Sequence, residues 1–341
     1  MPISITEFIK NLPKCELHLH IEGTLEPELM FELAKRNSIS IHYKSIDEVK
    51  KAYNYSDLQG FLDIYYESAK VLVNEIDFYD LTYAYLKKAH SQSVLHTEIF
   101  FDPQTHTNRG IEFSTVINGI NRALADAKEK LGISSKLIMC FLRDLDAQSA
   151  LETLEQALPY KELITAIGLD SAEVGNPPAK FDEVFKKAQV LGFLSVAHAG
   201  EEGPVEYIWG ALDILNVHRI DHGNKAIDDS ELIEKLSQRK IPLTMCPLSN
   251  LKLSVIDDLR NHPLKEMMKK GIVVTVNSDD PAYFGGYINE NYIAIAEALN
   301  LTHDEIAQIA INSFNASFLS PDEKLNATKK IDCYFSSSMK K

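Results

Sequence analysis

The sequence lacks the features that mark several classes of protein. Only four cysteines occur in 341 residues, no two form a C-x-x-C pair, and three lie inside short apolar runs. This pattern indicates reduced thiols rather than a disulfide framework. No apolar run reaches 18 residues, so we expect no membrane-spanning helix. The N-terminus has no basic segment followed by an apolar stretch, which argues against a secretory signal and favours a cytoplasmic location.

Positive charge is also scarce. Lys and Arg number 35 against 49 Asp and Glu, which gives a net charge of −14. A surface with this charge repels phosphate backbones, so nucleic acid is not expected as a partner. Hydrophobic residues make up 45% and charged residues 25%, which are ordinary globular values. The length fits one α/β barrel with insertions or two ordinary domains.

Eight short apolar or β-branched runs predict strands, and amphipathic stretches of helical length separate most of them. This alternation predicts parallel strands joined by right-handed crossovers, and eight of them close naturally into a (β/α)8 TIM barrel of the α/β class. A doubly wound open sheet is the alternative, but no G-x-G-x-x-G follows the first run. The predicted strands are 15–20, 94–101, 136–142, 164–170, 193–198, 218–221, 241–246 and 272–278.

We expect a single domain over residues 1–341, with two additions to the barrel. About residues 22–92 separate the first two strands, and the cluster from Phe61 to Tyr66 has apolar residues at helical spacing. A helical cap over the barrel mouth and an ordinary packed helix both fit this insertion. About residues 326–341 are polar and rich in Lys at the end, which predicts a frayed terminus.

Histidines and carboxylates stand at the ends of several apolar runs. His18 and His20 form an H-x-H pair, and residues i and i+2 of a strand point to the same side. His198 ends the fifth run, and Asp279 follows the eighth. Because the C-terminal ends of barrel strands converge on one face, these four side chains are expected to meet. Three imidazoles and a carboxylate suit one Zn²⁺ with an open position for water, and Fe²⁺ or Co²⁺ also fits this set.

The neighbouring polar residues suggest what such a metal would do. Water on the metal has a pKa near about 7, which supplies hydroxide at neutral pH. Glu201 lies three residues past His198 and, if buried, can keep its proton and act as a general acid. His222 can orient the hydroxide or take its proton, and Asp280 is free to contact a substrate. These groups fit hydrolysis of an amide, an amidine or a purine ring, and the residues alone do not choose among them.

Five motifs resemble, in order, those of the adenosine/adenine deaminase group of the amidohydrolase superfamily. The resemblance spans about residues 12–320 and implies a zinc-dependent barrel that replaces the 6-amino group of a purine by oxygen and releases ammonia, a step of purine salvage. The motifs are PKCELHLHIEG at 13–23, HAGE at 198–201, DHG at 221–223, CPLSN at 246–250 and SDDP at 278–281.

The resemblance also implies roles for individual residues. The three histidines and the aspartate named above would be the metal ligands. Glu201 would protonate ring N1, and His222 would orient or deprotonate the attacking water. Asp280 would hydrogen-bond N7, which is an acceptor, so its carboxyl must carry a proton.

Two positions depart from the pattern of adenosine-acting members. Glu22 stands where that pattern has an aspartate that meets the ribose, and its extra methylene intrudes on the space of the sugar. Glu173 stands where that pattern has a glycine, and its carboxylate is suited to accept the N9–H that free adenine has and adenosine lacks. The stretches 171–175 and 100–104 also resemble adenine-acting members. We therefore predict a small purine base as partner and the conversion of adenine to hypoxanthine and ammonia.

Other functions remain as alternatives. N6-substituted adenines or adenosine are possible substrates within the family, depending on the volume of the pocket. A metal-dependent phosphoesterase would place basic residues at the strand ends, where only Arg143 follows a predicted strand. A non-catalytic binding barrel would have little use for ligands, acid and base together.

Overall fold

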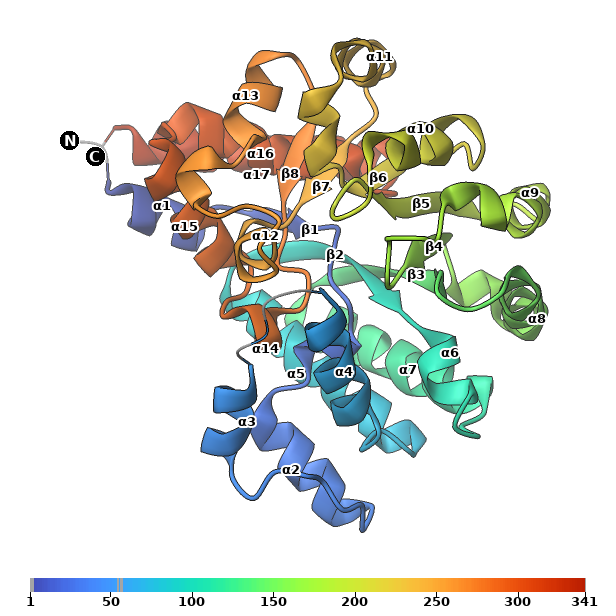
Figure 1. Ribbon diagram of the computed structural model, residues 1–341. Helices are drawn as coiled ribbons and strands as arrows, with labels where there is room; N and C mark the ends of the chain where they lie inside the picture. The colour runs from blue at the N-terminus through green and yellow to red at the C-terminus, as the bar shows by residue number, and fades with distance from the viewer. Residues whose placement is uncertain (1–2, 54, 56–57, 341) are drawn as a thin grey trace.

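The computed structural model describes residues 3–53, 55 and 58–340. Residues 1–2 and 341 of the expected domain, and residues 54 and 56–57 of the expected insertion, lie outside the described residues. In the described part of the protein, eight parallel strands lie at the centre of the molecule and helices surround them (Figure 1). The prediction of a (β/α)8 barrel is confirmed.

The strands follow one another around the barrel in chain order, and each neighbouring pair is parallel. They coincide with the eight predicted runs, although several are shorter. Their bounds are β1 (Lys14–Glu16), β2 (Val94–Phe101), β3 (Ser134–Leu142), β4 (Ala166–Asp170), β5 (Leu194–Ala199), β6 (Arg219–His222), β7 (Leu243–Met245) and β8 (Val274–Val276).

Backbone hydrogen bonds join the stretch after β1 to the stretch after β8. The N–H of His20 donates to the carbonyl of Asp279 over 3.0 Å, and the N–H of Asp279 donates to the carbonyl of His18 over 3.1 Å. The intervening Leu19 forms a parallel bridge with Asp279. This closure brings the H-x-H pair beside the aspartate of the last strand.

The first strand ends at Glu16, whereas the sequence predicted that it runs to His20. Side chains replace the ladder here: the N–H of Leu17 donates to Asn277 Oδ1 over 2.9 Å, and the N–H of Ser278 donates to Glu16 Oε1 over 3.2 Å. Buried backbone donors need partners, and these side chains provide them. His18 and His20 therefore lie on an irregular extended stretch just past the strand.

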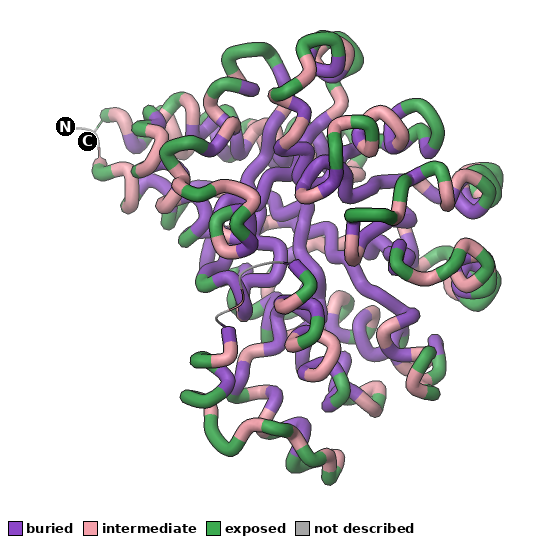
Figure 2. The backbone as a smooth tube through the Cα atoms, in the orientation of Figure 1, coloured by how far each residue is buried: buried purple, intermediate pink, exposed green. Residues whose placement is uncertain are grey.

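Helices form the outer layer. Their inner faces are buried together with the strands, and their outer faces are exposed (Figure 2). On α7, for example, Val116, Ile120, Ala123 and Ala127 are buried at the spacing of one helical face, as an amphipathic helix requires. Among the described residues, no helix combines the length and the apolar character needed to cross a bilayer.

The helices outside the insertion precede β1 or follow β2. Their bounds are α1 (Ile5–Asn11), α6 (Pro103–Thr107), α7 (Phe113–Leu131), α8 (Ala147–Ala157), α9 (Asp182–Val190), α10 (Val205–Asp213), α11 (Ser230–Arg239), α12 (Pro247–Lys252), α13 (Leu264–Lys269), α14 (Pro281–Phe284), α15 (Ile288–Leu299), α16 (His303–Ala316) and α17 (Pro321–Ser338). Short 3-10 turns are η2 (Leu158–Leu163), η3 (Pro178–Phe181), η4 (Asn224–Asp228) and η5 (Leu259–Asn261).

Among the described residues between β1 and β2, where the sequence predicted an insertion, there are five helical elements. They are η1 (Glu22–Thr24), α2 (Pro27–Arg36), α3 (Ile46–Ala52), α4 (Leu58–Ala69) and α5 (Glu75–Ser91). In Figure 1, α2 and α3 lie below the barrel, whereas α4 lies closer to the strands. The apolar cluster from Phe61 to Tyr66 is part of α4, and Phe61, Leu62 and Tyr65 are buried.

The prediction of a frayed terminus from about residue 326 is wrong, because α17 continues to Ser338. Its start is fixed by a capping box, in which Ser320 accepts from the N–H of Glu323 and Glu323 accepts from the N–H of Ser320. Ile331 is fully buried, so one face of this polar helix packs on the barrel layer. The sequence Ser-Pro-Asp-Glu at 320–323 was the signal for this helix.

Candidate active site

A buried polar cluster lies at the C-terminal ends of the strands. His18 and His20 follow β1, His198 lies near the end of β5, and Asp279 follows β8. His20 Nε2 is 3.2 Å from His198 Nε2, and His18 Nε2 is 3.2 Å from Asp279 Oδ1. One potential ligand atom from each of the four residues lies within 4.8 Å of the other three. The structure thus brings together all four residues that the sequence singled out for a metal.

The chemistry of these four side chains fits a divalent cation. Within the described chain, the buried His18 Nε2 has no hydrogen-bond partner. Burial lowers the pKa of His20 to about 4, so its imidazole is neutral and has a free lone pair. Burial opposes ionisation of Asp279, but the neighbouring His18 outweighs it and holds the pKa of this carboxyl well below its usual range. Imidazole nitrogens and one carboxylate are typical ligands of a transition-metal ion.

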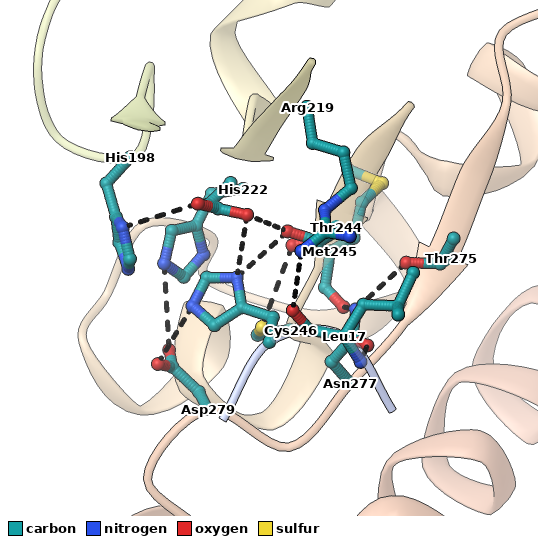
Figure 3. A network of polar contacts seen from close by, with 12 residues as sticks. Leu17, His198, Arg219, His222, Thr244, Met245, Cys246, Thr275, Asn277 and Asp279 are labelled. Carbon is teal, nitrogen blue, oxygen red and sulfur yellow. Dashed lines mark hydrogen bonds and ion pairs between the residues drawn. The ribbon is translucent and has the colours of Figure 1, made fainter. Parts of the chain in front are cut away.

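Hydrogen bonds on the far side of the rings set their orientation. The Thr244 hydroxyl donates to Asp221 Oδ1 over 2.7 Å, so it must accept from His18 Nδ1, which is 3.0 Å away (Figure 3). His198 Nδ1 donates to the carbonyl of Leu169 over 3.1 Å. When these rings are neutral and carry their proton on Nδ1, as metal binding requires, the Nε2 lone pairs face the centre of the cluster.

Glu201 lies beside the cluster and is 5% exposed. Its Oε2 is 3.4 Å from His222 Nε2, and its Oε1 has no hydrogen-bond partner in the described part of the chain. Burial, and after it the charge of Asp279, raises the pKa of Glu201 well above its ordinary value. A carboxyl in this state keeps its proton at neutral pH and is suited to act as a general acid.

The proton of His222 is placed by a neighbouring amide. Asn250 Oδ1 accepts from Asn224 Nδ2 over 2.9 Å and is 3.2 Å from His262 Nε2. Asn250 Nδ2 therefore faces His222 Nδ1, 3.3 Å away, and donates to it. Burial lowers the pKa of His222 to about 3, so the ring is neutral and its single proton is on Nε2. This N–H points toward Glu201 and Asp279 Oδ2, the latter 3.7 Å away.

The backbone is strained at two of these positions. His222 has a φ of 63° and Asp279 a φ of 64°, in the left-handed region that residues other than glycine rarely adopt. Such conformations cost on the order of 1 kcal/mol each and cluster at functional sites. Here His222 ends β6 and Asp279 lies just past β8, and the turn at each position holds a polar side chain in the cluster.

Asp280 lines the same pocket as Glu201 and is 4% exposed. Burial and the charge of Asp279 raise the pKa of Asp280 well above its usual range, and Oδ1 lacks a partner among the described residues. A β-carbon at Gly23 would overlap this carboxyl, so the glycine is what allows Asp280 to lie there. Asp280 is thus a protonated acid with one oxygen available to a ligand.

Glu173 does not have the surroundings expected of a substrate contact. Its Oε1 accepts from the N–H of Gly200 over 2.7 Å. Its Oε2 accepts from the N–H groups of Glu201, Glu202 and Gly203 over 3.1, 3.0 and 2.8 Å. Four backbone donors already occupy both oxygens, and in the described chain Glu173 is absent from the pocket lining. The predicted contact with N9–H is therefore corrected: this carboxylate binds the loop that carries Glu201.

Glu22 is buried behind the pocket wall. Its Oε1 accepts from His106 Nε2 over 2.8 Å and from the N–H of Asp102 over 3.4 Å. Within the chain as described, it does not line the pocket either. Its expected effect on the sugar remains a prediction.

Residues of α4 cover the pocket above the cluster. The lining residues are His20, Leu58, Phe61, Leu62, Tyr65, Tyr66, Asp102, Asp170, Ser171, His198, Glu201, His222, Leu253, Asp279, Asp280 and Phe284.

Sequence reasoning assigned no role to two pocket carboxyls, Asp102 and Asp170. Asp170 Oδ2 is 3.5 Å from His20 Nδ1, and potential ligand atoms of His20, Asp102 and Asp170 lie within 4.8 Å of one another. Burial raises the pKa of Asp170 to about 7 and that of Asp102 well above its usual value. Both residues end or follow an apolar strand, β4 or β2, which is the same signal that revealed Asp279.

Comparisons with known proteins agree with this geometry. The family described as adenosine deaminase matches residues 13–334. A curated adenine deaminase from Acinetobacter baylyi is 61% identical over 327 residues, which cover 96% of this chain and 98% of that protein. The crystal structure of adenine deaminase from Arthrobacter aurescens has a TM-score of 0.94 at 48% identity and covers 95% of this chain and 99% of that one. A zinc-bound amidohydrolase structure from Burkholderia ambifaria has a TM-score of 0.89 at 25% identity and covers 100% of this chain and 97% of that one. This chain belongs to the adenosine deaminase family.

Proposed function

We propose that this chain hydrolyses adenine to hypoxanthine and ammonia, with one Zn²⁺ bound by His18, His20, His198 and Asp279. The observation that carries the proposal is the meeting of this ligand set with a protonated carboxyl, that of Glu201, in one small buried pocket. The 61% identity to an adenine deaminase supports the substrate. The nitrogen-rich ligand set and the zinc in a relative's structure support the metal.

Each remaining residue has a task in this reaction. A bound divalent ion would supply hydroxide at neutral pH by lowering the pKa of water. Glu201 delivers its proton to N1, which makes C6 more electrophilic, and Asp280 donates its proton in a hydrogen bond to N7. The Nε2–H of His222 donates toward the oxygen that enters at C6 and holds it in line. The contact with Asn250 favours this orienting role of His222 over that of a base.

The protons balance without a further reactant. Water loses a proton, which restores the carboxyl of Glu201, and the resulting hydroxide adds at C6. Glu201 has meanwhile protonated N1, and that proton stays in hypoxanthine. The hydroxyl on C6 gives up its proton to the amine, the C–N bond breaks, and ammonia leaves as the carbonyl forms.

The alternatives outside the family have less support. A phosphoesterase needs a free cation at the strand ends. Arg143 is fully buried, and its guanidinium donates to the carbonyl of His198 over 2.7 Å and to that of Asn176 over 2.8 and 3.0 Å. This cation holds backbone in place and is not available to a phosphate.

We extend the proposal to the organisation and setting of the protein. Residues 1–341 act as a single barrel, and the helices of about residues 22–92 serve as its cap, since α4 covers the pocket. The reaction takes place in the cytoplasm as part of purine salvage.

A rate comparison tests the proposed function. Zinc-loaded protein is given adenine, adenosine and N6-methyladenine, and the loss of substrate absorbance is followed together with ammonia release. We expect one ammonia per hypoxanthine and a kcat/KM for adenine about 10⁴ times that for adenosine, the discrimination that a site built around a substrate hydrogen bond achieves. Faster turnover of adenosine, or of N6-methyladenine, would assign the chain to one of the alternative substrates.

A further inference from the structure

The proposed function leaves one edge of the base unassigned. Adenine has three polar positions near the reacting carbon: the amine, N1 and N7. The opposite edge has an acceptor, N3, and the only ring donor, N9–H. Buried polar groups are almost always paired, so the pocket should offer this donor an acceptor. That acceptor also decides between a free base and a nucleoside, in which the sugar replaces the hydrogen on N9.

Five carboxyls in the described chain line the pocket: Glu201, Asp280, Asp102, Asp170 and Asp279, the last of which is a proposed metal ligand. The first two serve N1 and N7 in the proposed reaction. Asp170 Oδ2 is 3.5 Å from His20 Nδ1, so this carboxyl lies against a proposed metal ligand. Asp102 is left, and its buried Oδ1 has no hydrogen-bond partner among residues 3–53, 55 and 58–340.

The backbone holds Asp102 firmly at the pocket wall. It directly follows β2 and precedes Pro103, the first residue of α6, and a proline restricts the residue before it to extended conformations. Its φ of −111° and ψ of 87° avoid the helical region that a following proline disfavours. Its N–H donates to Glu22 Oε1 over 3.4 Å, and the residue is 3% exposed. A carboxyl held in this way can select a ligand by position.

We propose that Asp102 is the specificity-determining residue of this site, and that its carboxyl accepts the N9–H hydrogen bond of the purine base. The inference rests on the proposed function. The carboxylate accepts this hydrogen more strongly than the carbonyl oxygen of the acid does, but Asp102 offers an acceptor in either state. In a nucleoside, the N9 substituent would meet this carboxyl and leave its oxygen buried without a partner.

The test compares adenine with 9-methyladenine, which has the same reacting carbon but no N9–H. In the wild type we expect kcat/KM for adenine to exceed that for 9-methyladenine by about 10³-fold or more. Asp102→Ala removes the acceptor and makes room for the methyl group, so this ratio should shrink at least ~100-fold. Asp102→Asn keeps an oxygen but not a charge, and should give an intermediate ratio. Asp144→Ala removes an exposed carboxylate just past β3 and should leave the ratio unchanged.

The ratio of the two kcat/KM values does not depend on how much of a variant folds or binds metal, because both substrates are assayed with the same active fraction of the protein. Product inhibition by hypoxanthine and by 9-methylhypoxanthine gives a second readout, and the preference for hypoxanthine should shrink in parallel. If both substrates slow by the same factor in Asp102→Ala and Asp102→Asn, Asp102 only supports Asp170 and His20, and the inference is overturned. If the wild type turns over adenine with no preference over 9-methyladenine, the inference fails while the proposed function stands. If the wild type does not turn over adenine, the proposed function fails, and the inference with it.

Discussion

The loop that carries Glu201 depends on one buried carboxylate, that of Glu173, which accepts four backbone N–H groups. In Glu173→Gln only one oxygen remains as an acceptor. If it keeps the three contacts of Oε2, the new NH2 faces the N–H of Gly200 and that donor loses its partner. Losing one charge-assisted hydrogen bond and weakening three others costs about 3–5 kcal/mol. The melting temperature should fall by several degrees.

The same substitution separates a loop-binding role from a substrate contact. With the loop loosened, Glu201 is misplaced, and kcat/KM for adenine should fall roughly 10–100-fold. The preference for adenine over 9-methyladenine should not change, because Glu173 lies outside the described pocket lining. Thermal unfolding and the two rates are measured beside Glu183→Gln, which removes an exposed carboxylate on α9. A stable Glu173→Gln protein with an altered substrate preference would refute the loop-binding role and indicate that Glu173 contacts the purine base.

Three further predictions test other parts of the site and the fold. Glu201→Gln should lower kcat by about 10³-fold at unchanged metal content, and retained turnover would remove Glu201 as the proton donor. Thr244→Val removes the link between Asp221 and His18, so metal affinity by competitive chelation should fall about 10–100-fold while excess zinc restores kcat. Glu98 of β2 and Arg219 of β6 form a buried ion pair. Burial opposes ionisation of Glu98, but Arg219 outweighs it and lowers the pKa of Glu98 from 4.5 to about 2. The stability that this pair contributes is therefore present above about pH 4.5 and lost as the pH falls toward 2. Glu98→Gln leaves Arg219 uncompensated and should cost about 3–5 kcal/mol at pH 7 in urea unfolding. The gap to the wild type should narrow between pH 4.5 and 2, and a constant gap would contradict this pKa assignment.

The barrel was predictable because its strands are buried on both faces and therefore appear as continuous apolar runs. Strand bounds were less accurate where side chains replace the backbone hydrogen bonds between strands. Asn277, for example, accepts the hydrogen bond from the N–H of Leu17. The sequence carries no local signal for such a contact, since its two partners are 260 positions apart. The terminal helix was missed for a different reason: its polar composition outweighed the capping signal at Ser320.

In the site, residues were predictable when a histidine or a carboxylate stood at or just past the end of a predicted strand. The H-x-H pair, His198 and Asp279 were found in this way, and the structure brings them together. Contacts between the loops of neighbouring strands were not predictable. The contact of Glu173 with the loop at 200–203 and that of Asn250 with His222 depend on the course of the loops that follow β4 and β5 and of those that follow β6 and β7. Composition explains neither of these contacts, and only three-dimensional proximity reveals them.

The central claim is that a single metal ion, held where His18, His20, His198 and Asp279 meet, makes this chain an adenine-hydrolysing enzyme. The most direct measurement is a titration of metal-free protein with zinc, in which bound zinc and the rate of adenine loss are recorded at each step. The account predicts that the rate starts near zero, rises in proportion to bound zinc and stops rising at one ion per chain. His20→Ala should abolish the tight-binding phase. Full turnover of adenine by the metal-free protein, or a rate that stops rising only at two ions per chain, would contradict it.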